Sequence, residues 1–150
     1  MKTRDPPSVF LTKLGKISFL VHVLGFFGAI LPFLINNLNS NNIPGFLGFL
    51  GVPTIVVTCV GAASSILIID SSQQCCAIQT RLCFAATLAC VAATFHIIFA
   101  FFEVIIFWIG GLTGTFDAIA GLLLIKNVAN ISFEILIAAS AIEAQKHLTG

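Results

Sequence analysis

Four apolar runs, each long enough to cross a lipid bilayer as an α-helix, follow one another along this chain. They cover residues 17–36, 46–69, 82–109 and 118–142, and a membrane-spanning helix needs about 20 apolar residues. Only 9% of the residues are charged and 58% are hydrophobic, with a mean hydropathy of +1.08. Soluble domains carry about 25% charged residues, so the sequence predicts an all-α, four-helix transmembrane bundle in contact with the lipid bilayer.

The basic residues outside these runs predict how the bundle is oriented. Every Lys and Arg except Lys126 lies before the first run, between the second and third runs, or after the fourth. Lys and Arg are enriched on the cytosolic side, so we expect both termini in the cytosol. Residues 1–16 then form a basic cytosolic segment, residues 17–142 a single four-span domain, and residues 143–150 a cytosolic tail. The expected location is the plasma membrane or an endomembrane.

The fourth run carries polar side chains near its middle. Lys126, Asn130 and Glu134 are spaced four residues apart, so they form one stripe on a helix. A charge at the bilayer centre costs roughly 2.5–3.5 kcal/mol, and the stripe must therefore face protein or water. It is either a structural contact that fixes the register of the helices or part of a path for protons or ions.

The depth of each side chain in the membrane can be counted at about 1.5 Å per residue from the middle of its run. This count places other ionisable residues at the levels of the stripe. Glu103 in the third run and Lys126 lie at similar levels in the outer half, so we expect an ion pair between them. Glu134 lies in the inner half at the level of His22 in the first run, and His96 lies close to the centre. We therefore expect Glu134 to contact His22 or His96.

Small residues recur at intervals of four, a spacing that lets two membrane helices approach closely. These helix-packing residues are Gly25 with Ala29, Gly61 with Ser65, and Ala85 with Ala89 and Ala93. We expect the first and the last of these sets to join two copies of the chain, which predicts a homo-oligomer.

The cysteines and histidines do not have the spacing of a metal site, so no metal is expected. Cys75 and Cys76 lie at the edge of the membrane, in the connection between the second and third runs. Cysteines in such a place are candidates for S-palmitoylation, and the alternative is that they are ordinary reduced thiols. Cys83 and Cys90 share one face of the third run, where we expect them to act as small packing residues.

No catalytic motif is present in the sequence. It has no glycine-rich phosphate loop, no HExxH and no GxSxG, and it lacks a cluster of arginines at the membrane face. We therefore expect no enzyme, no catalytic residue, no cofactor and no nucleic-acid partner.

Three stretches resemble spans of a known family. The first is KLGK at residues 13–16, which precedes SFLVHVLGFFGAI. The second is Gly51-Val52-Pro53, whose proline precedes the small residues 61–65. The third is Phe133-Glu134, which precedes the small residues 137–140. These stretches are similar to the first, second and fourth spans of the membrane-spanning four-domain subfamily A proteins, which include the B-lymphocyte surface antigen. The MARVEL-type four-span proteins of membrane trafficking and cell junctions share the topology and are a second possible relative.

The resemblance implies an accessory membrane protein that oligomerises, associates with receptors and influences their trafficking or ion entry. Of the residues above, it points to Glu134, the acidic residue of the fourth span. The chain departs from the family in the short connection between its third and fourth runs and in its short tails. The expected function is a non-enzymatic oligomeric scaffold or receptor-associated subunit. The alternative is a small transporter or channel for protons or ions that uses the intramembrane Glu, Lys and His residues.

Overall fold

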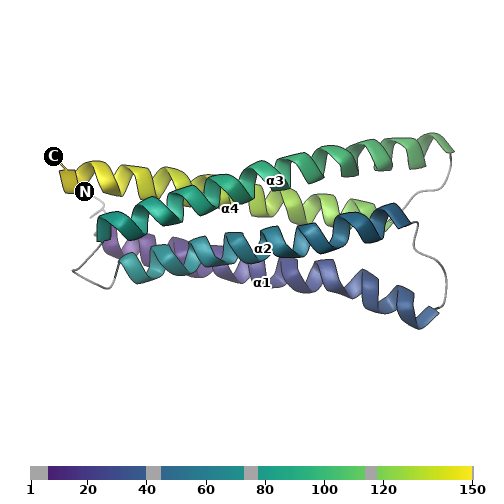
Figure 1. Ribbon diagram of the computed structural model, residues 1–150, viewed down its shortest axis with the longest axis horizontal. Coiled ribbons are helices and arrows are strands. Elements are labelled where there is room, and N and C mark those ends of the chain that lie inside the picture. The colour runs from purple at the N-terminus through teal and green to yellow at the C-terminus, as the bar shows by residue number, and fades with distance from the viewer. Residues whose placement is uncertain (1–6, 40–44, 73–77, 114–117, 150) are drawn as a thin grey trace, which may run out of the picture.

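The computed structural model contains four helices that run side by side along one long axis (Figure 1). α1 covers Pro7–Asn39, α2 covers Gly45–Ser71, α3 covers Ile78–Thr113 and α4 covers Ala118–Thr149. The structure describes residues 7–39, 45–72, 78–113 and 118–149, and the regular secondary structure in these ranges is entirely helical. The predicted all-α four-helix bundle is therefore confirmed.

Each helix contains a stretch that is long and apolar enough to cross a membrane. These stretches are Val9–Ile30, Val52–Ser71, Ile78–Ile105 and Gly121–Leu148, and the chain is accordingly a multi-pass membrane protein. The helices extend beyond the predicted apolar runs. For example, α1 already begins at Pro7 and α4 continues to Thr149. Proline suits the first position of a helix, where its missing N–H group would have no partner anyway.

The four helices form an up-and-down bundle with two distinct ends (Figure 1). α1 begins and α4 ends at one end, which we call the terminal end, and α2 ends and α3 begins there as well. At the other end, which we call the loop end, α1 and α3 end and α2 and α4 begin. The cytosolic location of the terminal end stays a prediction.

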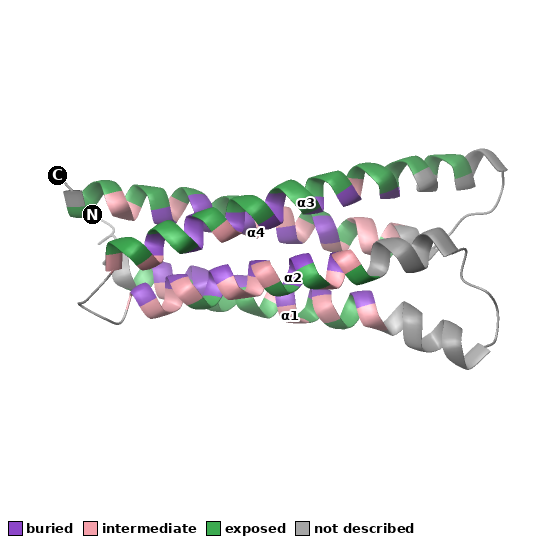
Figure 2. Ribbon diagram, viewed as in Figure 1, coloured by how far each residue is buried: buried purple, intermediate pink, exposed green. Residues whose placement is uncertain are grey.

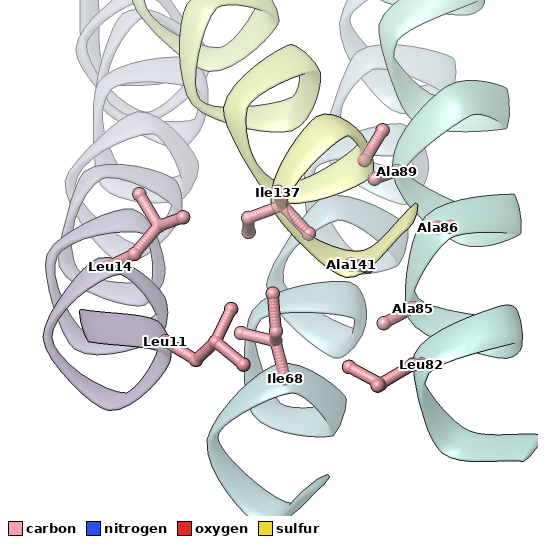
Figure 3. Close-up of a cluster of buried hydrophobic side chains, with 10 residues drawn as sticks. Leu11, Leu14, Ile68, Leu82, Ala85, Ala86, Ala89, Ile137 and Ala141 are labelled. Atoms are coloured by element: carbon pink, nitrogen blue, oxygen red, sulfur yellow. The ribbon is translucent and has the colours of Figure 1, made fainter. Parts of the chain in front are cut away.

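Burial follows the arrangement of the bundle, with buried residues on the inward side of each helix (Figure 2). Ten of them form an apolar cluster at the terminal end (Figure 3), namely Leu11, Leu14, Ile68, Leu82, Ala85, Ala86, Ala89, Ile137, Ala138 and Ala141. Large apolar side chains such as Phe27 and Ile125 cover the outside, with more than 60% of their surface exposed. This surface suits contact with lipid chains.

The predicted helix-packing residues are used inside the bundle. Ala85 and Ala89 are fully buried, Ala93 and Ala29 are buried, and so is Gly25. Gly61 and Ser65 are buried as well. The two faces that we expected to join copies of the chain are therefore occupied within one chain, because the helices of the same bundle fill them.

The described cysteines lie on the outer surface of the bundle. Cys83 and Cys90 are exposed, so they do not serve as small packing residues between the helices of this bundle. Cys75 and Cys76 lie outside the described residues.

Candidate functional site

The centre of the bundle holds one carboxylate between two histidines. Glu134 on α4 lies with its Oε1 atom 3.0 Å from Nε2 of His22 on α1. His96 on α3 lies with its Nδ1 atom 2.8 Å from Oε1 and 3.0 Å from Oε2 of the same carboxylate. All three side chains are fully buried. The expected contact of Glu134 with a histidine is present, and it involves both histidines; we call these three residues the carboxylate–histidine site.

Gly61 on α2 provides the space for this site. A Cβ atom at position 61 would lie 2.6 Å from both Oε1 of Glu134 and Cδ2 of His22, closer than such atoms approach in proteins. The absence of a side chain at this position therefore lets α2 pack directly over the contact between α1 and α4.

Serines connect the site to the α1–α2 interface on the side of the terminal end. Nδ1 of His22 donates to the backbone carbonyl of Ser18 at 2.7 Å, one helical turn earlier. The Ser18 hydroxyl lies 2.9 Å from that of Ser65, which in turn donates to the backbone carbonyl of Gly61 at 3.1 Å. This chain of contacts fixes the ring of His22 and the register of α1 against α2.

Weaker contacts surround the other histidine on the side of the loop end. Nε2 of His96 lies 3.4 Å from Oγ1 of Thr58 and 3.5 Å from Nδ2 of Asn130. Thr58 donates its hydroxyl proton to the backbone carbonyl of Thr54 at 2.8 Å. The Asn130 amide is therefore the donor that remains for Nε2 of His96.

Glu103 takes a partner that differs from the predicted one. Both of its carboxylate oxygens accept from Nδ2 of Asn127, at 2.9 and 2.8 Å. Nζ of Lys126 is buried and has no hydrogen-bond partner in the described part of the chain, although Lys126 attracts Glu103 and Glu134 through space. The expected Glu103–Lys126 ion pair is not formed, because Asn127 is the residue of α4 that faces Glu103 on α3.

Together these residues form a polar column along the bundle axis. We define it by its fully or nearly fully buried members Ser18, His22, Thr58, Ser65, His96, Glu103, Asn127, Asn130 and Glu134. The column begins at Glu103 on the side of the loop end and stops at Ser18 and Ser65. Leu14 and Ile137, about one turn further along α1 and α4, belong to the apolar cluster that closes the terminal end.

A shallow groove opens beside this column on the outer surface, between α1 and α2. Its volume is about 290 Å³, and its lining consists of His22, Val23, Phe26, Phe27, Thr58, Cys59 and Ala62. The exposed lining of the groove is apolar.

Sequence reasoning missed Thr58 and Ser18 as members of the column. Asn127 stands out in the sequence as an amide in an apolar run, but its contact with Glu103 was not predicted. Thr58 and Ser18 carry no such signal, because hydroxyl groups often satisfy themselves on the preceding helical turn of a membrane helix.

The site contains acceptors, donors and titratable groups, so its side chains can bind and share protons. No group of His, Cys, Asp and Glu side chains that could hold a metal ion occurs among the residues that the structure describes. Comparison of the chain with protein-family models, curated proteins and solved structures finds no match.

Proposed function

We propose that this chain is a non-enzymatic tetraspan membrane protein that acts as an oligomeric scaffold or receptor-associated accessory subunit, modulating trafficking, signalling or ion entry. One observation carries the proposal: the polar column stops inside the bundle, at the apolar cluster of the terminal end. A column of this kind joins helices and does not lead from one face of the membrane to the other.

The apolar cluster forms a tight closure. Ile68, Leu82 and Ile137 are at most 1% exposed, and they come from three different helices (Figure 3). An ion that left the column at Ser18 would lose its polar contacts there, and transfer of an unpaired ion into an apolar medium is very costly. The buried polar groups therefore serve register and helix choice, which apolar contacts alone determine poorly in lipid.

Association with other proteins takes place within the membrane in this proposal. The outer surface consists largely of exposed apolar side chains such as Phe27 and Ile125, and further copies of the chain or receptor helices contact this surface. The resemblance to the membrane-spanning four-domain subfamily A proteins supports an accessory role of this type.

A second candidate is a small transporter or channel for protons or ions. Three buried polar atoms favour it, namely Nζ of Lys126 and the Oδ1 atoms of Asn127 and Asn130, which have no hydrogen-bond partner in the described ranges. They lie in the half of the bundle nearer the loop end. Groups of this type line the ion and proton paths of membrane proteins.

A flux measurement distinguishes the two candidates. Purified protein is reconstituted in liposomes, and proton and cation movement is followed under a pH or cation gradient for the wild type, Glu134→Gln and Lys126→Ala. Ile125→Ala serves as the matched control, because Ile125 lies on the same helix but faces outward. We expect no flux above that of empty liposomes. Flux that disappears in Glu134→Gln and persists in the control would contradict the scaffold proposal and favour the transporter.

Subunit counting tests the oligomeric part of the proposal. Fluorescently labelled chains are extracted with their native lipid, and photobleaching steps are counted in single particles. We expect two or more chains per particle; single steps throughout would contradict a homo-oligomer.

A further inference from the structure

The ring of His22 has a defined tautomer. Its Nδ1 atom lies 2.7 Å from the backbone carbonyl oxygen of Ser18. A carbonyl oxygen only accepts hydrogen bonds, so the short distance requires a proton on Nδ1. The nitrogen that faces Glu134, at 3.0 Å, is therefore Nε2.

With this tautomer, the contact between His22 and Glu134 needs one more proton. In a neutral imidazole with its proton on Nδ1, Nε2 is an acceptor, and an ionised carboxylate is an acceptor only. Two acceptors would then face each other at 3.0 Å in a fully buried place, where such repulsion is strong. One additional proton between Nε2 and Oε1 converts this repulsion into a hydrogen bond.

The other histidine does not supply that proton. Nδ1 of His96 lies within 3.0 Å of both oxygens of Glu134 and donates its own proton to them. Nε2 of His96 faces the Asn130 amide, which donates, and the hydroxyl of Thr58, whose proton goes to Thr54. The proton that His96 gives to Glu134 is therefore the one on Nδ1, and it does not enter the contact between His22 and Glu134.

The proton count of the site follows from these three contacts. Each histidine carries a proton on Nδ1, and a further proton lies between His22 and Glu134. This further proton compensates the charge of the buried carboxylate, which would be costly if left uncompensated.

The surroundings add few charges to this cluster. On α4, Lys126 attracts both Glu134 and Glu103, and Glu103 is the other charged group that α3 directs into the described interior. The groups of α2 beside the site are uncharged, namely Thr58, Gly61, Ser64 and Ser65. Apart from His22, the charged residues described on α1, Lys13 and Lys16, are exposed near the terminal end.

We propose that His22, Glu134 and His96 form a proton-binding site that holds one proton between Nε2 of His22 and Oε1 of Glu134, and that this proton joins α1 to α4. When the proton leaves to solvent, the carboxylate of Glu134 loses this compensation and two acceptors face each other. The contact between α1 and α4 then weakens. This inference holds for a scaffold and for a transporter alike, so it does not rest on the function proposed above.

Glu134→Gln tests the proposal, because its amide reproduces the protonated carboxyl group. The amide nitrogen donates to Nε2 of His22 permanently, and the amide oxygen accepts from Nδ1 of His96. Unfolding by SDS from mild-detergent micelles is measured against pH for the wild type, Glu134→Gln and Glu103→Gln.

We expect the wild type and the two variants to differ in how their stability changes above neutral pH. Above about pH 6.5 an exposed histidine is neutral, so the unfolded chain lacks the proton that the folded site holds between His22 and Glu134. This proton should contribute a fall of about tenfold per pH unit in the folding constant until the folded site releases it. Glu134→Gln should show no such fall, whereas Glu103→Gln, which keeps the site, should retain it. An alkaline fall in Glu134→Gln equal to that of the wild type would overturn the proposal.

Nitrogen-15 NMR of the wild type gives a second readout that needs no variant. Histidine labelling reports His22, His96 and His147, and the exposed His147 serves as the internal reference. We expect protonated Nδ1 in His22 and in His96, and one proton lost from the buried group on alkaline titration. An unprotonated Nδ1 in His22 would overturn the proposal even if Glu134→Gln failed to fold.

Discussion

Replacement of Gly61 by alanine should separate the effect of space at the carboxylate–histidine site from the general effect of a glycine in a helix. The new Cβ atom would lie 2.6 Å from Oε1 of Glu134 and from Cδ2 of His22. Neither group has room to retreat, because the Nδ1 atom of His22 is held by Ser18 and the carboxylate by His96. The contact between His22 and Glu134 must therefore open.

The magnitude follows from two terms. Overpacking of a filled interior costs about 1–3 kcal/mol, and an interhelical hydrogen bond in a membrane protein contributes about 0.6–1.7 kcal/mol. Together they predict a loss of about 2–5 kcal/mol. Alanine also gains up to about 1 kcal/mol over glycine in helix propensity, so a reference with the same gain is needed.

Gly28→Ala provides that reference. A Cβ atom at position 28 would meet nothing within 4 Å, so only the propensity gain applies. Both variants are unfolded by SDS from mild-detergent micelles, followed by energy transfer between labels on α1 and α4. We expect Gly61→Ala to unfold at a lower SDS fraction than Gly28→Ala, with a difference of about 2–5 kcal/mol. Equal unfolding of the two variants would refute the view that Gly61 provides space for the site.

Two further predictions concern the ends of the bundle. Glu103→Gln should cost more stability in the wild type than in the Lys126→Met background, with a coupling of about 0.5–3 kcal/mol in a double-mutant cycle. Equal costs in the two backgrounds would contradict attraction between these charges. Leu82→Ala in the apolar cluster should lower the free energy of unfolding by about 2 kcal/mol or more in the same SDS assay. Phe84→Ala on the outer surface should lower it far less, and equal losses in the two variants would contradict the assigned burial.

The sequence predicted the class of fold because a membrane permits few alternatives. With no water to satisfy backbone groups, long apolar runs must form helices, and short connections place successive helices side by side. Depth along each helix also followed from residue counting. For this reason Glu134 could be matched to His22, which lies a long way off in the chain.

Residue counting gives the level of a side chain but not the direction in which it points. Lys126 and Asn127 lie at nearly the same level, yet they differ by about 100° around the helix, and Asn127 is the residue that faces Glu103. The small-residue faces illustrate the same limit. Their spacing predicted close packing correctly, but it did not indicate that the partner of Ala85 and Ala89 lies in the same chain.

The position of Glu134 explains how one residue influences all four helices. Its carboxylate contacts α1 through His22 and α3 through His96, while α2 comes within reach only because Gly61 has no side chain. Apolar contacts between helices resemble contacts with lipid, so polar contacts of this kind determine which helices become neighbours. One of these contacts depends on a proton. Assembly of the bundle and the proton content of its centre are therefore coupled, and a change at either one must appear in the other.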